Sequence, residues 1–175
     1  MRPLLLALVV VTSVPAQTDG RLSVSGSAVL HGLVGAGGVG GVPAASLSGS
    51  YRLGEGDRLG AFVLVSPESQ GIPQLAVVGG AWDVLIDRGG GPYVTVGLAI
   101  ARQRAVDIPL CSPEDDLCFD ESGVDRRGFT ALAAVLGGGV RFDLGRGAFV
   151  RTDLRLLAGP ELVRPLLGVG GGVRL

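Results

Sequence analysis

Apolar and polar residues alternate one by one along most of this chain, and this two-residue period constrains the fold more than any other feature. From 22 to 31, the residues Leu22, Val24, Gly26, Ala28 and Leu30 alternate with Ser23, Ser25, Ser27, Val29 and His31. No segment shows the 3.6-residue stripe of an amphipathic helix. Because successive side chains of a β-strand point to opposite faces, the pattern predicts an all-β fold.

Turn-forming residues divide the chain into eight such segments. They predict strands at 21–34, 42–53, 58–66, 74–86, 92–104, 128–144, 148–158 and 164–175. Three tight connections, at 54–57, 87–91 and 145–147, alternate with four generally longer ones, of which the longest is 105–127. This layout is typical of antiparallel up-and-down transmembrane barrels, and it places both chain ends on the periplasmic, short-turn side.

The two faces of the predicted strands differ in chemistry. One face carries large apolar residues, namely Leu47, Tyr51, Leu53, Trp82, Val84, Val94, Val96, Leu98, Ile100, Leu132, Leu136, Val140, Phe142, Leu154, Leu156, Val169 and Val173. The other carries Ser46, Ser48, Ser50, Arg52, Asp83, Thr95, Gly97, Gly139, Arg141, Asp143, Arg151, Asp153, Arg155 and Arg174. A soluble barrel would turn the apolar set inward. The second set suits a narrow polar lumen, so we predict that the first set faces lipid.

Within the lumen we expect a charge network in which the glycine positions leave room for long side chains. Its members are Arg52, Asp83, Arg141, Asp143, Arg151, Asp153, Arg155 and Arg174. In particular, Arg141 and Arg151 are expected to pair with an aspartate, the candidates being Asp83, Asp143 and Asp153. Aromatic residues near the short turns predict an interfacial girdle of Tyr51, Trp82, Tyr93, Phe142 and Phe149, with ordinary core aromatics as the alternative.

A short pattern recurs where strands return toward the short turns. The sequences 50–53, 81–84, 139–142 and 172–175 all read small, apolar, charged, apolar. The last of them predicts that the eighth strand runs to Leu175, with Val173 and Leu175 facing outward and Arg174 facing inward.

The first residues predict a signal rather than a strand. Arg2 precedes the apolar run 4–11, and Val14-Pro15-Ala16 supplies a cleavage site after Ala16. A membrane anchor is the alternative, but a spanning helix needs about 20 apolar residues. We therefore expect a secretory signal peptide at 1–16 and one barrel domain at 17–175.

These features resemble the small eight-stranded outer-membrane barrels of the OmpA transmembrane-domain or OmpX kind, over residues 21–175. The resemblance implies an integral protein of the cell outer membrane, in contact with lipid and lipopolysaccharide. It also implies assembly by the outer-membrane machinery through the C-terminal strand, although Leu175 stands where such proteins usually have an aromatic residue. We expect a monomeric, non-enzymatic protein without a cofactor, in a structural or surface-interaction role. The alternative is a narrow channel or carrier for small solutes.

Other chemistry has weaker support. Gly35, Gly37 and Gly40 match G-x-G-x-x-G, but Pro43 and a strand follow where a dinucleotide site needs a helix, so we interpret this run as a loop. His31 is the only histidine, and Leu33 stands two positions beyond it, where a serine would suggest a lipid A-modifying enzyme. The formal net charge of −1 does not favour nucleic acid as a partner.

The longest predicted loop has two features of its own. Cys111 and Cys118 are the two cysteines of the chain, and an even count in an exported protein favours a disulfide. The loop is also acidic, and candidate ligands for a divalent cation are Asp115, Asp116, Asp120 and Glu121. Their spacing does not match an EF-hand, so we expect a solvated acidic surface loop.

Overall fold

The computed structural model describes residues 21–35, 38–68, 73–86, 91–105, 128–160 and 162–175. These residues form eight strands: β1 (Leu22–Gly35), β2 (Gly38–Arg52), β3 (Asp57–Ser66), β4 (Leu75–Leu85), β5 (Gly91–Gln103), β6 (Phe129–Gly145), β7 (Ala148–Gly159) and β8 (Leu162–Arg174). The described residues include no helix long and apolar enough to cross a membrane. The prediction of an all-β chain with eight strands is confirmed.

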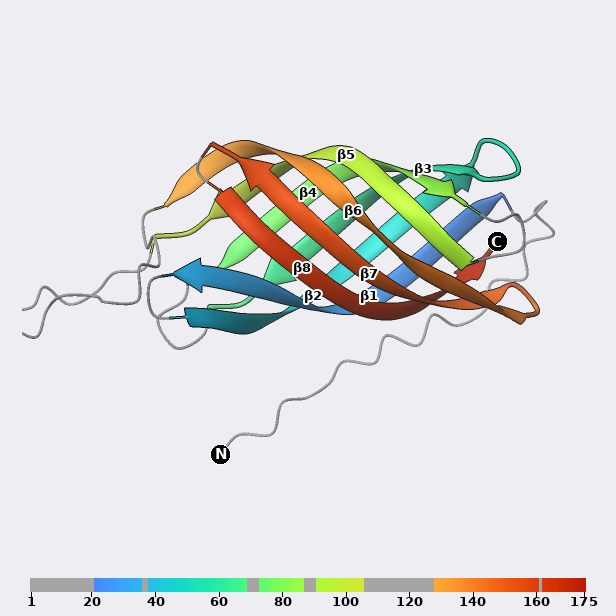
Figure 1. Ribbon diagram of the computed structural model, residues 1–175, viewed down its shortest axis with the longest axis horizontal. Coiled ribbons are helices and arrows are strands. Elements are labelled where there is room, and N and C mark those ends of the chain that lie inside the picture. The colour runs from blue at the N-terminus through green and yellow to red at the C-terminus, as the bar shows by residue number, and fades with distance from the viewer. Residues whose placement is uncertain (1–20, 36–37, 69–72, 87–90, 106–127, 161) are drawn as a thin grey trace, which may run out of the picture.

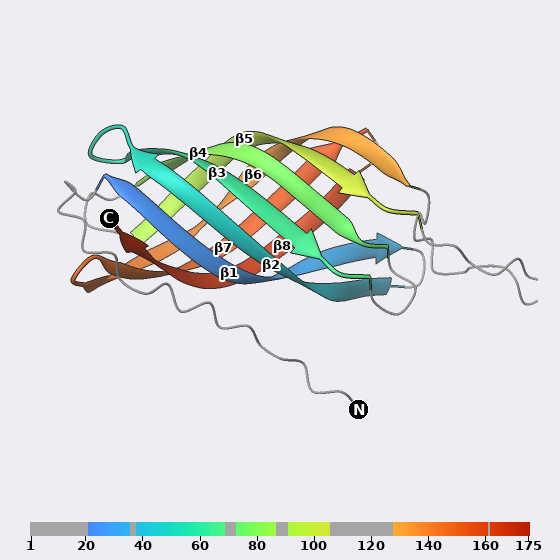
Figure 2. The same ribbon diagram turned by 180° about the vertical axis from the view of Figure 1, so that it is seen from behind.

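The strands close into one barrel in sequence order. Each pairs antiparallel with the next, and β8 pairs with β1, so that Ser23 lies opposite Arg174 and His31 opposite Leu166. Figure 1 shows β5 to β8 on the near side of the tilted barrel, and Figure 2 shows β1 to β4 on the other side. The chain is thus an antiparallel up-and-down barrel, in which the closed ladder leaves no free sheet edge.

The glycine-rich run after β1 differs from its prediction. Gly35 pairs with Gly38, and Gly40 pairs with Leu33, so both belong to the β1–β2 ladder rather than to a loop. Gly37 lies outside the described residues. These two glycines therefore lie in paired strands, and β2 begins four residues earlier than the pattern indicated, at Gly38 instead of 42. Glycine has no side chain, so it does not contribute to the alternation of apolar and polar residues from which the start of this strand was predicted.

The tight turn between β6 and β7 requires the two glycines at 145 and 147. Gly145, Arg146 and Gly147 have φ angles of 81°, 50° and 80°. Glycine adopts this left-handed region without steric cost, and an arginine flanked by two glycines completes a tight hairpin. The turn lies at the same end of the barrel as the β2–β3 turn and the C-terminus (Figure 1).

The outward face is an apolar belt, as its period predicted. Leu98, Leu136 and Leu154 are 61%, 48% and 62% exposed. Of the residues assigned to this face, only Val140 and Val173 are half-buried, and they share the parity of their exposed neighbours. A barrel with this exterior would present a large apolar surface to water, whereas lipid matches it.

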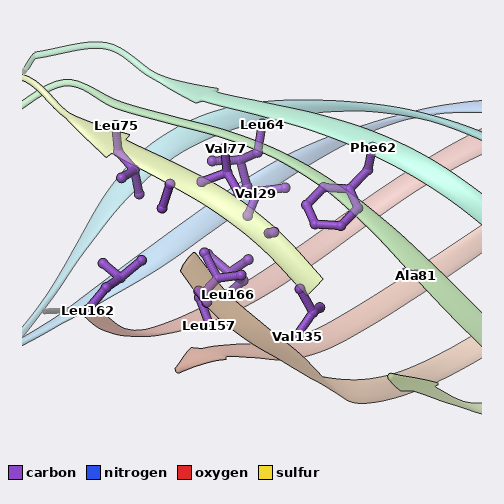
Figure 3. Close-up of a cluster of buried hydrophobic side chains, with 13 residues drawn as sticks. Val29, Phe62, Leu64, Leu75, Val77, Ala81, Val135, Leu157, Leu162 and Leu166 are labelled. Atoms are coloured by element: carbon purple, nitrogen blue, oxygen red, sulfur yellow. The ribbon is translucent and has the colours of Figure 1, made fainter. Parts of the chain in front are cut away.

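The interior is polar over only half of its length, which corrects the expectation of a lumen filled by polar side chains. The half near the longer connections holds a buried apolar cluster, drawn in Figure 3, of Val29, Phe62, Leu64, Leu75, Val77, Ala81, Ala99, Ala101, Ala133, Val135, Leu157, Leu162 and Leu166. The strands are apolar on both faces there, as in the run Ala131–Leu136 of β6. A two-residue period is invisible where both faces are apolar, so the pattern revealed only the polar half.

Candidate functional site in the barrel lumen

Asp153 on β7 is the centre of the polar half. Its Oδ2 lies 3.0 Å from Nε of Arg151, and its Oδ1 lies 2.9 Å from Nη2 of Arg155. The Tyr93 hydroxyl of β5 donates to the same Oδ1. Asp153 and Arg155 are 6% and 8% exposed, so water provides little screening. One carboxylate thus compensates two guanidinium groups, which its four lone-pair directions allow.

A second carboxylate does the same nearer the short turns. Asp143 accepts from Arg141 on its own strand, at 3.2 Å from Nε to Oδ1, and forms an ion pair with Arg174 of β8. Arg141 also lies flat over the ring of Phe149, with 3.4 Å between its Cζ and the ring centroid. The cation–π contact and the ion pair together hold Arg141 against β6 and β7.

Serines of β1 and β2 line the opposite wall. The hydroxyls of Ser23 and Ser50 are 2.8 Å apart, as are those of Ser25 and Ser48. Arg151 crosses the lumen and donates from Nη2 to the Ser48 hydroxyl over 3.2 Å. The wall therefore ties β7 to β2 through side chains, across strands that are not neighbours in the barrel.

The two remaining predicted members, Arg52 and Asp83, lie on β2 and β4. Asp83 accepts a hydrogen bond from the Thr95 hydroxyl at 2.7 Å. Arg52 faces the lumen half-buried, directly opposite Arg58 in the β2–β3 ladder. The pattern missed Arg58, although it shares the parity of Phe62 and follows the tight turn that should have placed it beside Arg52.

Two aromatic residues correct the predicted girdle. Tyr93 and Phe149 are 5% and 3% exposed and point into the lumen, whereas Tyr51, Trp82 and Phe142 are 45%, 46% and 59% exposed on the outside. Strand parity alone separates the two groups, because Tyr93 shares its face with the buried Thr95. The alternative of core aromatics therefore holds for these two.

Glycines of β6 and β8 make room for these side chains. A Cβ atom at Gly139 would lie 2.8 Å from the Tyr93 hydroxyl, and one at Gly172 would lie 2.6 Å from Cζ of Phe149. Such distances are far below van der Waals contact. Because these inward-facing glycines have no side chain, they leave the space that the rings of Tyr93 and Phe149 occupy.

A polar pair lies at the other end of the lumen. His31 Nε2 is 2.9 Å from the Ser66 hydroxyl, which also lies 3.3 Å from the Pro43 carbonyl oxygen. His31 and Ser66 are 1% and 0% exposed. The sequence did not suggest this contact because 35 residues separate the two.

The polar and apolar halves meet at a small cavity. Ser27, Phe62, Arg155 and Leu166 are among the residues that line it, and its volume of about 20 Å³ has room for a water molecule. Cys111, Cys118, Asp115, Asp116, Asp120 and Glu121 lie outside the described residues. Within the described strands and turns, no group of three or more histidine, cysteine or acidic residues could hold a metal ion.

Comparisons with known proteins show a similarity of fold but not of sequence. No protein-family model matches the chain, and no curated protein does. Neisserial surface protein A matches with a TM-score of 0.66 at 15% identity, over 90% of this chain and 98% of that one. The N-terminal β-barrel domain of Pseudomonas aeruginosa OprF matches with a TM-score of 0.59 at 16% identity, over 87% and 97%.

A third match is Ail, the attachment invasion locus protein of Yersinia pestis, in complex with the heparin analogue sucrose octasulfate. Its TM-score is 0.58 at 12% identity, over 89% of this chain and 98% of Ail. At these identities the likeness concerns the fold alone. The chain has the fold of the small eight-stranded outer-membrane barrels, as the resemblance in its sequence implied.

Proposed function

We propose that this chain is an integral outer-membrane protein with a structural or surface-interaction role and no conducting pore. Lipid and lipopolysaccharide would contact its apolar belt, and the assembly machinery would recognise its C-terminal strand. The fold it shares with the surface protein of Neisseria and with Ail supports this membrane location. The belt supports it independently, because exposed residues such as Leu98 and Leu154 match a hydrocarbon environment.

The apolar cluster in the lumen is the observation that carries this role. Four of its side chains point to the barrel axis and are at most 2% exposed, so they fill this part of the interior: Leu64, Val77, Val135 and Leu157. Eight strands give an interior just wide enough for side chains to fill. A path for ions would have to pass through a packed apolar layer, where an ion loses its hydration without compensation.

Planar-bilayer conductance separates this role from that of a narrow channel or carrier. We expect no discrete conductance steps from protein whose gel mobility shifts on boiling, which shows that the barrel is folded. The Leu157→Ala variant, which removes part of the apolar layer, serves as the comparison. Steady conductance of the unmodified protein would favour the channel, with Arg52, Arg141, Arg151, Arg155 and Arg174 setting its ion preference.

One observation favours the alternative function of an enzyme acting on membrane lipid, namely the hydrogen bond between His31 and Ser66. Both side chains are buried inside the barrel, whereas lipid lies outside it. We therefore propose that the pair connects β1 to β3 rather than acting as a nucleophile and base. Lipid A mass profiles of cells with and without the protein should be identical, and a profile that changes with the protein but not with its Ser66→Ala variant would show enzymatic activity.

A further inference from the structure

Positive charge exceeds negative charge in the polar half of the lumen. The inward-facing arginines of the described strands there are Arg52, Arg58, Arg141, Arg151, Arg155 and Arg174. The inward-facing carboxylates are those of Asp83, Asp143 and Asp153. Asp153 and Asp143 each already serve two arginines. Three positive charges therefore have no carboxylate of their own in this part of the barrel.

Arg58 shows the imbalance most clearly. It is 6% exposed, and its one hydrogen bond within the described residues is a long one, 3.5 Å from Nη1 to the Ser23 hydroxyl. Its buried Nε has no partner there. Asp83 lies opposite it in the β3–β4 ladder but accepts from the Thr95 hydroxyl, and Asp143 pairs with Arg141 and Arg174. In the described part of the chain, no carboxylate forms an ion pair with Arg58.

The neighbours of Arg58 add like charge. Arg52 lies directly opposite it in the β2–β3 ladder, where like charges repel. Arg174 and Arg141 also repel it, whereas Asp143 and Asp83 attract it less strongly than Arg174 and Arg52 repel it. Arg141 in turn has a buried Nη2 without a partner in the described strands. Three guanidinium groups near the short-turn end of the lumen thus each have a buried donor without a partner in the described strands, namely Arg58, Arg141 and Arg174.

A buried guanidinium without an ion-pair partner is costly, and its planar set of donors matches the geometry of an oxyanion such as phosphate. We propose that the short-turn end of the lumen binds one inorganic oxyanion, of the phosphate or sulfate class, between Arg58, Arg141 and Arg174. The anion would supply the acceptors that Arg58 Nε and Arg141 Nη2 lack. It would also offset the repulsion between Arg58 and Arg52, so its binding would stabilise the folded barrel.

The closed barrel limits the route by which such an anion could reach the lumen. The strands separate the lumen from the lipid on all sides, and the apolar cluster blocks the opposite end. A free anion could therefore enter only at the short-turn end. A lipid phosphate could reach no further than the rim, which makes free phosphate and anionic lipid separable in an experiment.

The test uses full-length protein extracted into a non-ionic, phosphate-free detergent. Thermal unfolding is followed by the loss of the heat-modifiable gel form while sodium phosphate is titrated against sodium chloride at equal ionic strength. A ligand that binds only the folded state raises the midpoint with the logarithm of its concentration. We expect phosphate to raise the midpoint saturably and chloride to have no comparable effect, with one phosphate bound per chain in equilibrium dialysis.

Arg58→Gln should lose the response to phosphate while unfolding in chloride at the same temperature as the unmodified protein or above it, since it removes an uncompensated charge. Arg58→Lys keeps the charge but not the planar donor array, and we expect it to bind phosphate about tenfold more weakly. Arg102→Gln is the matched control, because Arg102 is exposed on the outward face of β5. It should retain the full response.

Three results would overturn the proposal. The first is the absence of a saturable phosphate effect in the unmodified protein, and the second is an equal effect in Arg58→Gln. The third is a response to added phosphatidylglycerol but not to inorganic phosphate, which would assign the charge to lipid at the rim. None of these results depends on conductance, so the proposed non-conducting role is tested separately.

Discussion

Tyr93 of β5 and Asp153 of β7 are joined by a hydrogen bond that passes over the intervening strand β6. Gly139 of β6 is the register partner of both residues. The phenol can reach Asp153 only because no side chain rises from β6 between them. The contact therefore depends equally on a tyrosine, a glycine and an aspartate that are far apart in the sequence.

Gly139→Ala should destabilise the barrel. The added methyl group would lie 2.8 Å from the Tyr93 hydroxyl and closer still to a backbone oxygen of β7. Overpacking of this kind costs about 1–3 kcal/mol, which a lower midpoint of unfolding in urea should report. Gly26→Ala is the control, since its nearest heavy atom would be 3.9 Å away. Equal midpoints for the two variants would mean that β6 can shift to accommodate a side chain.

Asp153→Asn should be the most damaging substitution in the charge network. It leaves Arg151 and Arg155 buried without their shared counter-charge, and removing one partner of a buried ion pair costs roughly 3–5 kcal/mol. Arg141→Leu should lower the urea midpoint by less, because Asp143 keeps Arg174 as its partner. If both variants unfold at the midpoint of the unmodified protein, water fills the lumen and screens these charges.

Leu154 and Arg155 are adjacent residues on opposite faces of β7. Leu154 is 62% exposed, so Leu154→Arg should cost about 2–4 kcal/mol if this position lies near the bilayer midplane. Arg155→Leu should avoid that lipid penalty and affect only the lumen, where it removes the contacts with Asp153 and with the Phe62 ring. Spin labels at the two positions should report lipid contact at 154 and not at 155. The opposite result would mean that the barrel does not present its apolar belt to lipid.

Cys111 and Cys118 remain predicted to form a disulfide. Closing so short a loop stabilises by about 2–3 kcal/mol on the chain-entropy model. The effect should be local, because the sequence predicts both cysteines in the connection 105–127 rather than in a strand. Replacing both by serine should leave the gel-mobility shift intact and make 105–125 more sensitive to external protease. Free thiols in the non-reduced protein would exclude the bridge, and protection from protease in both forms would place the loop in the periplasm.

The number of strands, their order and most of their bounds could be predicted from the residue pattern alone. The pattern also predicted which face of β2 and of β4 to β8 turns outward, because the two-residue period couples side-chain chemistry directly to strand geometry. The contacts of Arg141 with Asp143 and of Arg151 with Asp153 follow from the same parity, since residues two apart on a strand share one face.

Which residues meet across the barrel could not be predicted in this way, because these contacts depend on the closure of the sheet. Closure brings Tyr93 to Asp153, His31 to Ser66 and Arg58 to Ser23, and no local pattern encodes these pairs. The structure also reveals that half of the interior is apolar. Strands such as β6 are apolar on both faces there, so their sequence shows no two-residue period. The register and curvature of all eight strands together set which side chains converge, so a single strand read alone reveals its faces but not its partners.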